Sequence, residues 1–209
     1  MAAGLVVAAG SGERLGAAVP KALVPLAGRP MLEWSLLALK AVVSDIVVAL
    51  PPGTDWSMPG VTTVTGGGVR SESVLAAFEA APNGDPILVH DAARPLASAA
   101  LFARTLEELS GSGADAVIAA LPVSDTVKRV ADGRVVETLD RSQLWAVQTP
   151  QVFRRAALQS ALRGDLGGAT DDASLVEAAG GEVRVVPGEP DNFKITVPAD
   201  LARAEGMLA

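Results

Sequence analysis

The chain has 209 residues, of which 49% are hydrophobic and 3% aromatic, and its formal net charge is −7. This length and composition predict a single domain with a mainly aliphatic core. The acidic balance argues against a general binding surface for nucleic acid or for an anionic membrane, so a polyanion would have to bind at a local basic site.

The chain contains no cysteine and a single histidine, His90. Disulfides, thiolate metal sites and multi-histidine metal sites are therefore excluded. The apolar run near the N-terminus has no basic region before it and soon meets glycine and Glu13. We accordingly expect neither a signal peptide nor a transmembrane span, and we expect a cytoplasmic protein.

Short apolar runs alternate with helical patterns along the chain, which is typical of an α/β fold with a mostly parallel sheet. Strands are predicted at residues 5–8, 45–50, 61–65, 87–89, 116–120, 144–147, 182–186 and 195–197. Helices are predicted from Pro30, over 74–78, over 98–109, over 154–162, from Thr170 as the N-cap and from Pro198. No linker is long enough to divide the chain, so we predict one domain over residues 1–209.

The first predicted strand opens into a loop of alanine, glycine and serine at residues 8–12, and the cations Arg14 and Lys21 follow. Glycine lets backbone N–H groups approach an anion, because it has no Cβ in the way. The stretch therefore predicts a polyphosphate site; the alternative is a strand-to-helix turn with incidental charges.

Two common phosphate fingerprints do not fit this loop. Gly10 and Gly12 match G-x-G-x-x-G, but Leu15 stands where the third glycine belongs. A P-loop would require lysine where Ala17 stands. The loop is therefore of a third kind.

Two further loops follow predicted strands. Residues 66–68 are three consecutive glycines, which allow a ligand close to the backbone or simply form a flexible turn. Asp91 and Arg94 follow the strand at 87–89, where ligands bind in open α/β sheets. Asp91 is either a magnesium ligand or a turn residue, and His90 is more typical of a packed structural residue than of a base.

A β-hairpin is predicted from residues 126–130 and 134–139, which alternate apolar and polar side chains around Asp132 and Gly133. No helix is placed to cover this hairpin, so we expect it to project. An isolated two-stranded arm is marginally stable, and pairing with a second subunit would stabilise it.

Six motifs occur in order between residues 8 and 196: AAGSGERLG with Pro20–Lys21, GGGVRSESV, HDAARP, DRSQLW with TPQVF, ATDDASLVE and DNFKIT. Together they resemble the 2-C-methyl-D-erythritol 4-phosphate cytidylyltransferase family. The resemblance implies a Rossmann-like nucleotidyltransferase fold and a homodimer interlocked through β-arms, here at about 124–142. It also implies transfer of a cytidylyl group from CTP to methylerythritol phosphate with Mg²⁺, in non-mevalonate isoprenoid biosynthesis, with no organic cofactor.

The resemblance also implies a role for particular residues. The catalytic cations are Arg14 and Lys21, and the metal ligand is Asp91. The nucleotide-binding positions are Ala8, Ala9, Gly10, Gly12, Gly67, Arg70, Ser73, Ala92 and Arg94. The acceptor-binding positions are Thr126, Arg141, Thr170, Asp191 and Lys194, of which Arg141 and Thr170 would reach the neighbouring subunit's site. The chain departs from the family pattern at Gly68, where a carboxylate is often found, and at Ala22, where the side chain is often larger.

Three alternatives remain open. A ribitol 5-phosphate cytidylyltransferase would share the CTP half and differ around Arg141, Thr170 and Asp191. A uridylyl- or guanylyltransferase for another sugar phosphate is the second. A catalytically silent nucleotide-binding protein is the third, although such a protein would not need Arg14, Lys21 and Asp91 together.

Overall fold

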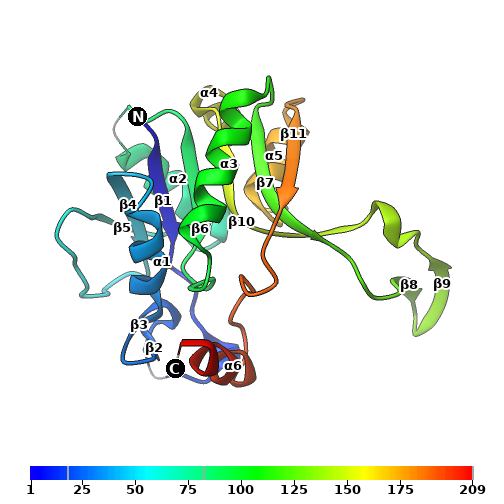
Figure 1. Ribbon diagram of the computed structural model, residues 1–209, viewed down its shortest axis with the longest axis horizontal. Coiled ribbons are helices and arrows are strands. Elements are labelled where there is room, and N and C mark those ends of the chain that lie inside the picture. The colour runs from blue at the N-terminus through cyan, green and yellow to red at the C-terminus, as the bar shows by residue number, and fades with distance from the viewer. Residues whose placement is uncertain (18, 82, 209) are drawn as a thin grey trace.

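The computed structural model describes residues 1–17, 19–81 and 83–208. Seven strands form one sheet in the order β11-β7-β10-β6-β1-β4-β5 (Figure 1). Their bounds are β1 Ala3–Val7, β4 Asp45–Leu50, β5 Thr62–Thr65, β6 Ile87–Asp91, β7 Ala116–Pro122, β10 Trp145–Phe153 and β11 Val183–Pro187. β10 runs antiparallel to β6 and β7, and the other neighbouring pairs are parallel. The predicted mostly parallel sheet is confirmed.

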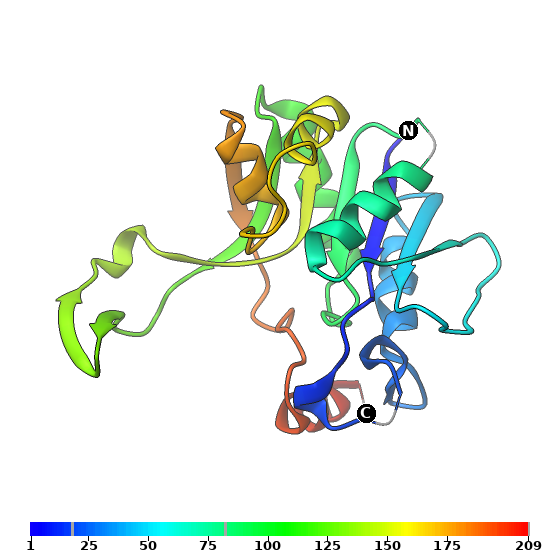
Figure 2. The same cartoon turned by 180° about the vertical axis from the view of Figure 1, so that it is seen from behind.

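Helices cover both faces of this sheet, as Figures 1 and 2 show from opposite sides. Their bounds are α1 Met31–Leu39, α2 Arg70–Ala80, α3 Ala99–Gly111, α4 Arg155–Ala161 and α5 Asp172–Ala178. α1 and α3 pack on one face, and α2, α4 and α5 pack on the other. The expected α/β architecture with helices on both faces is therefore confirmed.

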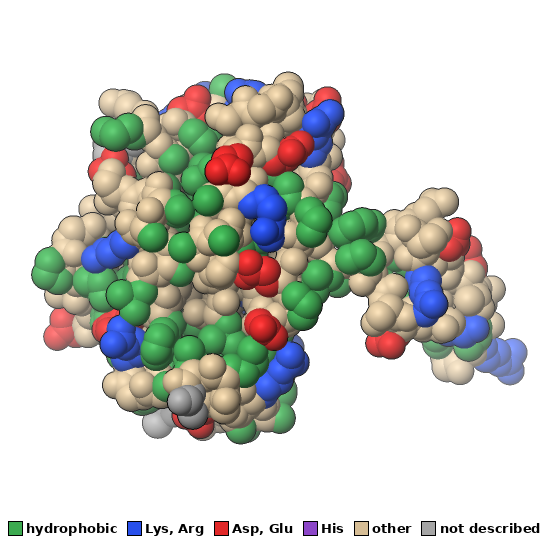
Figure 3. All heavy atoms as spheres, in the orientation of Figure 1, with side chains coloured by type: hydrophobic (Ala, Val, Ile, Leu, Met, Phe, Trp, Pro, Cys, Tyr) green, Lys and Arg blue, Asp and Glu red, His purple; other side chains and the backbone are tan. Residues whose placement is uncertain are grey.

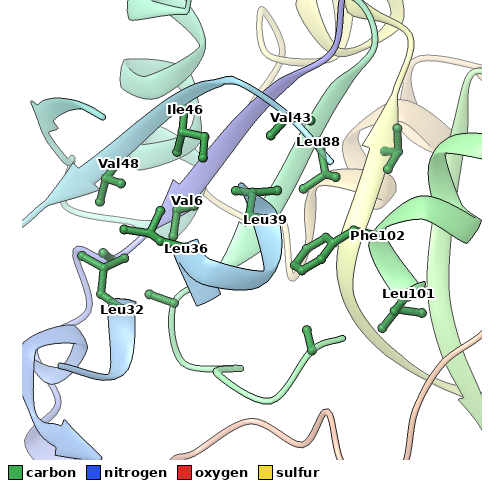
Figure 4. Close-up of a cluster of buried hydrophobic side chains, with 14 of the residues drawn as sticks. Val6, Leu32, Leu36, Leu39, Val43, Ile46, Val48, Leu88, Leu101 and Phe102 are labelled. Carbon is green, nitrogen blue, oxygen red and sulfur yellow. The ribbon is translucent and has the colours of Figure 1, made fainter. Parts of the chain in front are cut away.

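The core has two layers because successive residues of a strand point to opposite faces. Val6 belongs to the layer under α1 and α3, whereas Leu5 belongs to the layer under α2. Figure 4 shows the first layer, in which Leu36 and Leu39 of α1 lie near Val6. Phe102 of α3 lies in the same layer, and all these side chains are fully buried. Burying each contributes roughly 1.5–3 kcal/mol relative to exposure.

A small lobe packs beneath the sheet and joins the two ends of the chain. It consists of the two-stranded ribbon β2 (Pro25–Leu26) and β3 (Arg29–Pro30), the helix α6 (Pro198–Leu208) and the short turns at Glu13–Leu15 and Lys21–Leu23. Its own apolar cluster includes Leu26 and Met31 from the N-terminal part and Ile195 and Ala204 from the C-terminal part. The lobe therefore brings the residues just before α6 close to the loop after β1.

The predicted hairpin forms a two-stranded arm from β8 (Lys128–Ala131) and β9 (Arg134–Thr138). Its turn has positive φ at Asp132 and Gly133, 48° and 74°, as a tight hairpin turn requires. The arm stands apart from the body as a separate lobe (Figure 3), which confirms the expected projection. No helix of the described residues is long and apolar enough to cross a membrane.

Three sequence predictions about elements are wrong. β10 does not stop at Gln148 but continues to Phe153, because a register shift between Val147 and Gln151 lets it pair again with β7. Residues 195–197 form no strand, since the backbone N–H groups of positions 196 and 197 bond instead to the Asp200 carboxylate. The N-cap of α5 is Asp171 and not Thr170. The Asp171 side chain accepts a hydrogen bond from the backbone N–H of Ser174.

Candidate functional site

A cavity of about 520 Å³ opens at the carboxyl ends of β1 and β6. From β1 the chain adds β4 and β5 on one side and then returns to place β6 on the other, so the cavity lies at a topological switch point. Open α/β sheets bind ligands at such points, and a volume of this size is typical of small-molecule sites.

The loop after β1 forms one wall and delivers two cations. Gly12 has φ of 74°, and a Cβ there would lie 2.8 Å from the Cβ of Lys21. Glycine therefore allows the close packing of the loop against Lys21, which lines the cavity. Burial lowers the pKa of Lys21, and the nearby charges of Lys194 and Arg14 lower it further. Within the part of the chain that the structure describes, neither Arg14 nor Lys21 forms an ion pair with a carboxylate. Both cations are therefore unpaired, although the more distant charges of Asp91 and Asp200 raise the pKa of Lys21 and Glu13 also lines the cavity.

The glycines before α2 form the facing wall as a closely packed turn. A Cβ at Gly66 would lie 2.5 Å from the Cβ of Ala9, so the two loops meet. The backbone N–H of Gly67 donates to the Ser73 hydroxyl at 3.1 Å, and that of Gly68 donates to a carboxylate oxygen of the helix at 2.7 Å. Gly67 and Gly68 thus place backbone on the cavity wall, and hydrogen bonds to side chains of α2 fix the conformation of the turn.

Asp91, the last residue of β6, is held by two cations. Its Oδ1 accepts a hydrogen bond from Arg70 Nε at 3.0 Å, and its Oδ2 accepts one from Lys194 Nζ at 2.7 Å. Burial by itself would raise the pKa of Asp91, but the two cations hold it well below its usual range. Arg70 also donates through Nη1 to Asp172 Oδ2 at 2.6 Å. Asp91 is therefore an ionised carboxylate on the cavity wall.

The side chains on the cavity wall could bind a divalent cation only if a bound ligand supplied further coordinating oxygens. Among the described residues, no group of three or more histidine, aspartate or glutamate side chains is arranged to hold a metal ion. Mg²⁺ is commonly held by one or two carboxylates together with substrate phosphates. Asp91 has about four lone-pair positions, of which two are used. It therefore fits a metal ion shared with a bound polyphosphate.

His90 is a structural residue, as the sequence analysis favoured. Its Nε2 lies 3.1 Å from the Arg94 carbonyl oxygen and so carries the proton. Its Nδ1 lies 3.1 Å from Thr149 Oγ1, which itself accepts the Asp91 N–H at 3.0 Å. The ring also packs edge-on against Phe102. Both nitrogens are occupied, and the chain of bonds aligns the end of β6.

Most of the predicted residues line the cavity. They are Ala8, Ala9, Gly10, Lys21, Gly67, Arg70, Ser73, Asp91, Ala92 and Lys194. Gly12 lies behind the wall, and Arg14 is exposed near it. The wall also contains residues to which the sequence analysis gave no role: Val7, Ser11, Glu13, Val69 and Ala93. All of them are adjacent in the sequence to motif residues, and this adjacency is the signal from which they could have been predicted to line the cavity.

The structure does not bring the remaining predicted residues into this cavity. Arg94 is not on the cavity wall and donates to the carbonyl oxygens of Asn192, at 2.7 Å, and Val147, at 3.2 Å. It thereby joins the loop after β6 to β10 and to the segment before α6.

The acceptor residues other than Lys194 are exposed and lie outside the cavity wall. They are Thr126, Arg141, Thr170 and Asp191. Arg141, in a short 3-10 turn at Arg141–Gln143, donates to the carbonyl oxygen of Ser124 at the root of the arm. The cavity of one chain thus holds the predicted nucleotide half of the site and only one predicted acceptor residue.

Comparison with known proteins gives concordant matches. A family model described as 2-C-methyl-D-erythritol 4-phosphate cytidylyltransferase matches residues 2–209. The chain is 44% identical over 219 residues to the enzyme of that name from Cereibacter sphaeroides, covering 99% of this chain and 96% of that protein. The corresponding Rhodococcus jostii protein is 47% identical, with 98% and 93% covered.

Two other relatives add to this. A bifunctional enzyme IspD/IspF from Anaeromyxobacter dehalogenans is 46% identical, and the chain spans 56% of its length. The crystal structure of 2-C-methyl-D-erythritol 4-phosphate cytidylyltransferase from Thermus thermophilus superposes with a TM-score of 0.85 at 38% identity, covering 98% of this chain and 97% of that one.

The buried histidine predicts a pH dependence of stability. Burial lowers the pKa of His90 from 6.5 to about 4, so between these values the unfolded chain binds a proton that the folded chain does not. The free energy of unfolding should be constant with respect to His90 above pH 6.5 and should fall by about 3 kcal/mol as the pH drops to about 4. Urea denaturation at several pH values measures this.

His90→Gln is the matched control, because a glutamine can still donate to the Arg94 carbonyl. The slope between pH 4 and 6.5 should flatten in this variant. A single imidazole NMR signal titrating near pH 6.5 in the folded protein would contradict the prediction.

Proposed function

The chain belongs to the 2-C-methyl-D-erythritol 4-phosphate cytidylyltransferase family, and we propose that its cavity binds CTP with the triphosphate at Lys21 and Arg14. As a member of the family it is an enzyme that transfers a cytidylyl group from CTP to 2-C-methyl-D-erythritol 4-phosphate, in isoprenoid biosynthesis. The unpaired positive charge of Lys21 and Arg14 at a switch-point cavity is the observation that carries the residue assignment.

The reaction needs no nucleophilic side chain. A phosphate oxygen of methylerythritol phosphate attacks the α-phosphorus of CTP and forms a new P–O bond, while the bond from the α-phosphorus to the bridging oxygen breaks. Pyrophosphate leaves with that electron pair. Catalysis then consists of positioning and of stabilising the charge that grows on the phosphates. Lys21 and Arg14 supply this stabilisation in our proposal, because a bound triphosphate would occupy the positive region that they create.

The loop backbones supply the rest of the nucleotide site. Residues 8–10 would line one side of the nucleotide, and Gly67, Arg70 and Ser73 the pyrimidine side, where cytosine requires both donors and acceptors. Their position on the cavity wall supports this assignment. Ala92 would lie by the ribose. Arg94 is engaged with two carbonyl groups, so we propose that it supports the site from behind.

We propose that a divalent cation, Mg²⁺, is held jointly by Asp91 and the phosphate oxygens. When bound, it would neutralise charge on the triphosphate. Arg70 and Lys194 contribute by keeping Asp91 ionised and oriented toward the cavity. The low pKa of Asp91 and its place on the wall support this role.

The acceptor half is proposed to form across a homodimer. Thr126, Arg141, Thr170 and Asp191 lie outside the cavity of their own chain, and the arm projects from the body (Figure 1). The arm exposes apolar side chains, with Val130 56%, Val135 61% and Val136 59% exposed. Exposed apolar surface on a thin two-stranded arm favours association. Arg141 and Thr170 of one chain would then complete the phosphate and polyol contacts at the other chain's Lys194.

Substrate choice can be measured by pyrophosphate release. We expect the highest kcat/KM for CTP with methylerythritol 4-phosphate, compared with UTP, ATP or GTP and with ribitol 5-phosphate. The small cavity with a fixed backbone frame should discriminate pyrimidine hydrogen-bonding patterns. Equal or better use of ribitol 5-phosphate would favour the alternative cytidylyltransferase.

Lys21→Ala should lower kcat by about a hundredfold or more, the usual scale for losing one transition-state donor. Lys40→Ala is the matched control, since Lys40 lies at the end of α1 away from the cavity wall and its side chain donates to the Pro59 carbonyl oxygen. Steady-state kinetics on both variants gives the answer. A Lys21→Ala enzyme with near-normal turnover would remove Lys21 from its proposed role.

The double variant Val130→Glu with Val135→Lys tests the arm. These residues are cross-strand partners, so an ion pair between the new side chains can keep the hairpin while two of its three exposed valines are removed. We expect a monomer by sedimentation, with activity lost at low protein concentration. Val185→Lys, on the exposed edge strand β11, is the control and should leave the dimer intact. An active monomer would refute the shared site.

A further inference from the structure

We propose that Asp172 is a positioning residue of the nucleotide site, which acts through Arg70 to keep Asp91 available to a divalent cation. The inference rests on the proposed metal role of Asp91. Asp172 is the first residue of α5, its side chain is fully buried, and it does not line the cavity. Its only ion pair among the described residues is with Arg70, 102 positions earlier.

Four charges alternate in sign from α5 to the cavity. Asp172 accepts from Arg70 at 2.6 Å, Arg70 donates to Asp91 at 3.0 Å, and Lys194 donates to the other oxygen of Asp91 at 2.7 Å. The side chains of Asp172 and Asp91 are 0% and 9% exposed. Water therefore screens the two Arg70 ion pairs less than an ion pair on the surface, whereas Lys194 is 42% exposed and its pair is screened more.

The geometry of the Arg70 guanidinium explains why its second partner matters. Guanidinium presents its donors in a rigid planar fork that matches a carboxylate through two nitrogens. Here Nε donates to Asp91 and Nη1 donates to Asp172, while Nη2 is buried without a partner among the described residues. The guanidinium is thus held between two carboxylates. A neutral asparagine at 172 would hold it more weakly than a carboxylate does, so more of the positive charge of Arg70 would act on Asp91 in competition with a metal ion.

Charge balance leads to the same conclusion. Burial raises the pKa of Asp172, and its ion pair with Arg70 opposes that rise. With Asp172 ionised, the two carboxylates around Asp91 offset the two cations, Arg70 and Lys194. Loss of the Asp172 charge would leave this group with one excess positive charge. A divalent cation would then bind less tightly, whereas an anionic triphosphate would bind as well as before or better. A purely structural role for Asp172 would instead weaken the binding of both ligands.

The start of α5 is held by contacts that do not need the Asp172 charge. Asp171 caps the helix at Ser174 N, 3.0 Å away, and accepts from Gln151 Nε2 at 2.8 Å. The hydroxyl of Ser71 also donates to the Leu166 carbonyl oxygen at 2.7 Å. Because an asparagine at 172 has the same shape and can still accept from Arg70, we expect Asp172→Asn to fold.

The test measures Mn²⁺ binding by electron paramagnetic resonance on the full-length enzyme with CTP and no acceptor. Asp172→Asn should weaken Mn²⁺ binding about tenfold, the scale seen when a partner of a metal ligand is removed. CTP affinity without metal, measured by calorimetry, should be unchanged or higher. Asp171→Asn removes an equal charge from the adjacent residue that does not contact Arg70, and it should leave Mn²⁺ affinity unchanged.

The double variant Arg70→Met with Asp172→Asn tests whether Asp172 acts through Arg70. It should bind Mn²⁺ as the single variant Arg70→Met does, because the residue through which Asp172 acts is already absent. Replacing both members of a buried ion pair by neutral groups is usually tolerated, so we expect the double variant to fold.

Each outcome is informative. Unchanged Mn²⁺ affinity in Asp172→Asn, a parallel loss of Mn²⁺ and CTP binding, or a double variant that binds Mn²⁺ more weakly than Arg70→Met would overturn the role of Asp172. A wild-type complex that fails to bind Mn²⁺, or an Asp91→Asn complex that binds it normally, would overturn the proposed metal role of Asp91 instead.

Discussion

The carboxylate of Asp91 at the end of β6 is the interaction on which the site depends. A buried anion is unfavourable unless it is paired, and here it is paired with Arg70 from α2 and Lys194 from the segment before α6. These two ion pairs join three distant parts of the chain around one cavity. They also separate the nearby cations into two kinds. Lys194 is paired with Asp91, whereas Lys21 and Arg14 form no ion pair among the described residues.

The unpaired cations explain why the cavity suits an anionic ligand. The chain as a whole is acidic, with a net charge of −7, yet the loop after β1 concentrates unpaired positive charge at the cavity. A local site of this kind attracts a polyphosphate without turning the whole surface into an anion-binding surface. The partly buried Lys21 also explains why the cavity suits a reacting triphosphate, because a desolvated cation interacts more strongly with developing charge.

The acceptor half follows a different principle. The nucleotide half is built on strand ends within one rigid sheet, whereas most acceptor residues lie on the projecting arm and on exposed loops. Residues in these positions can contact a substrate only if a second chain packs against them. The exposed valines of the arm favour such association. In our proposal, division of the site between the sheet and the projecting arm links substrate binding to association of two chains.

Local signals in the sequence, strand periodicity and glycine loops, predicted the α/β class, the projecting hairpin and the loops that border the cavity. The roles of Arg70, Ser73 and Lys194 came instead from the resemblance to a known family. The sequence analysis erred where distant contacts override local preference: β10 continues past Gln148 by shifting its register against β7, and the backbone N–H of Thr196 bonds to the Asp200 carboxylate instead of a strand. It quoted Asp172 only within the motif ATDDASLVE and gave it no role, because its partner Arg70 is distant in the sequence. Arg70 and Asp172 are 102 positions apart, so only the tertiary structure decides that they pair, because only folding brings their charges together.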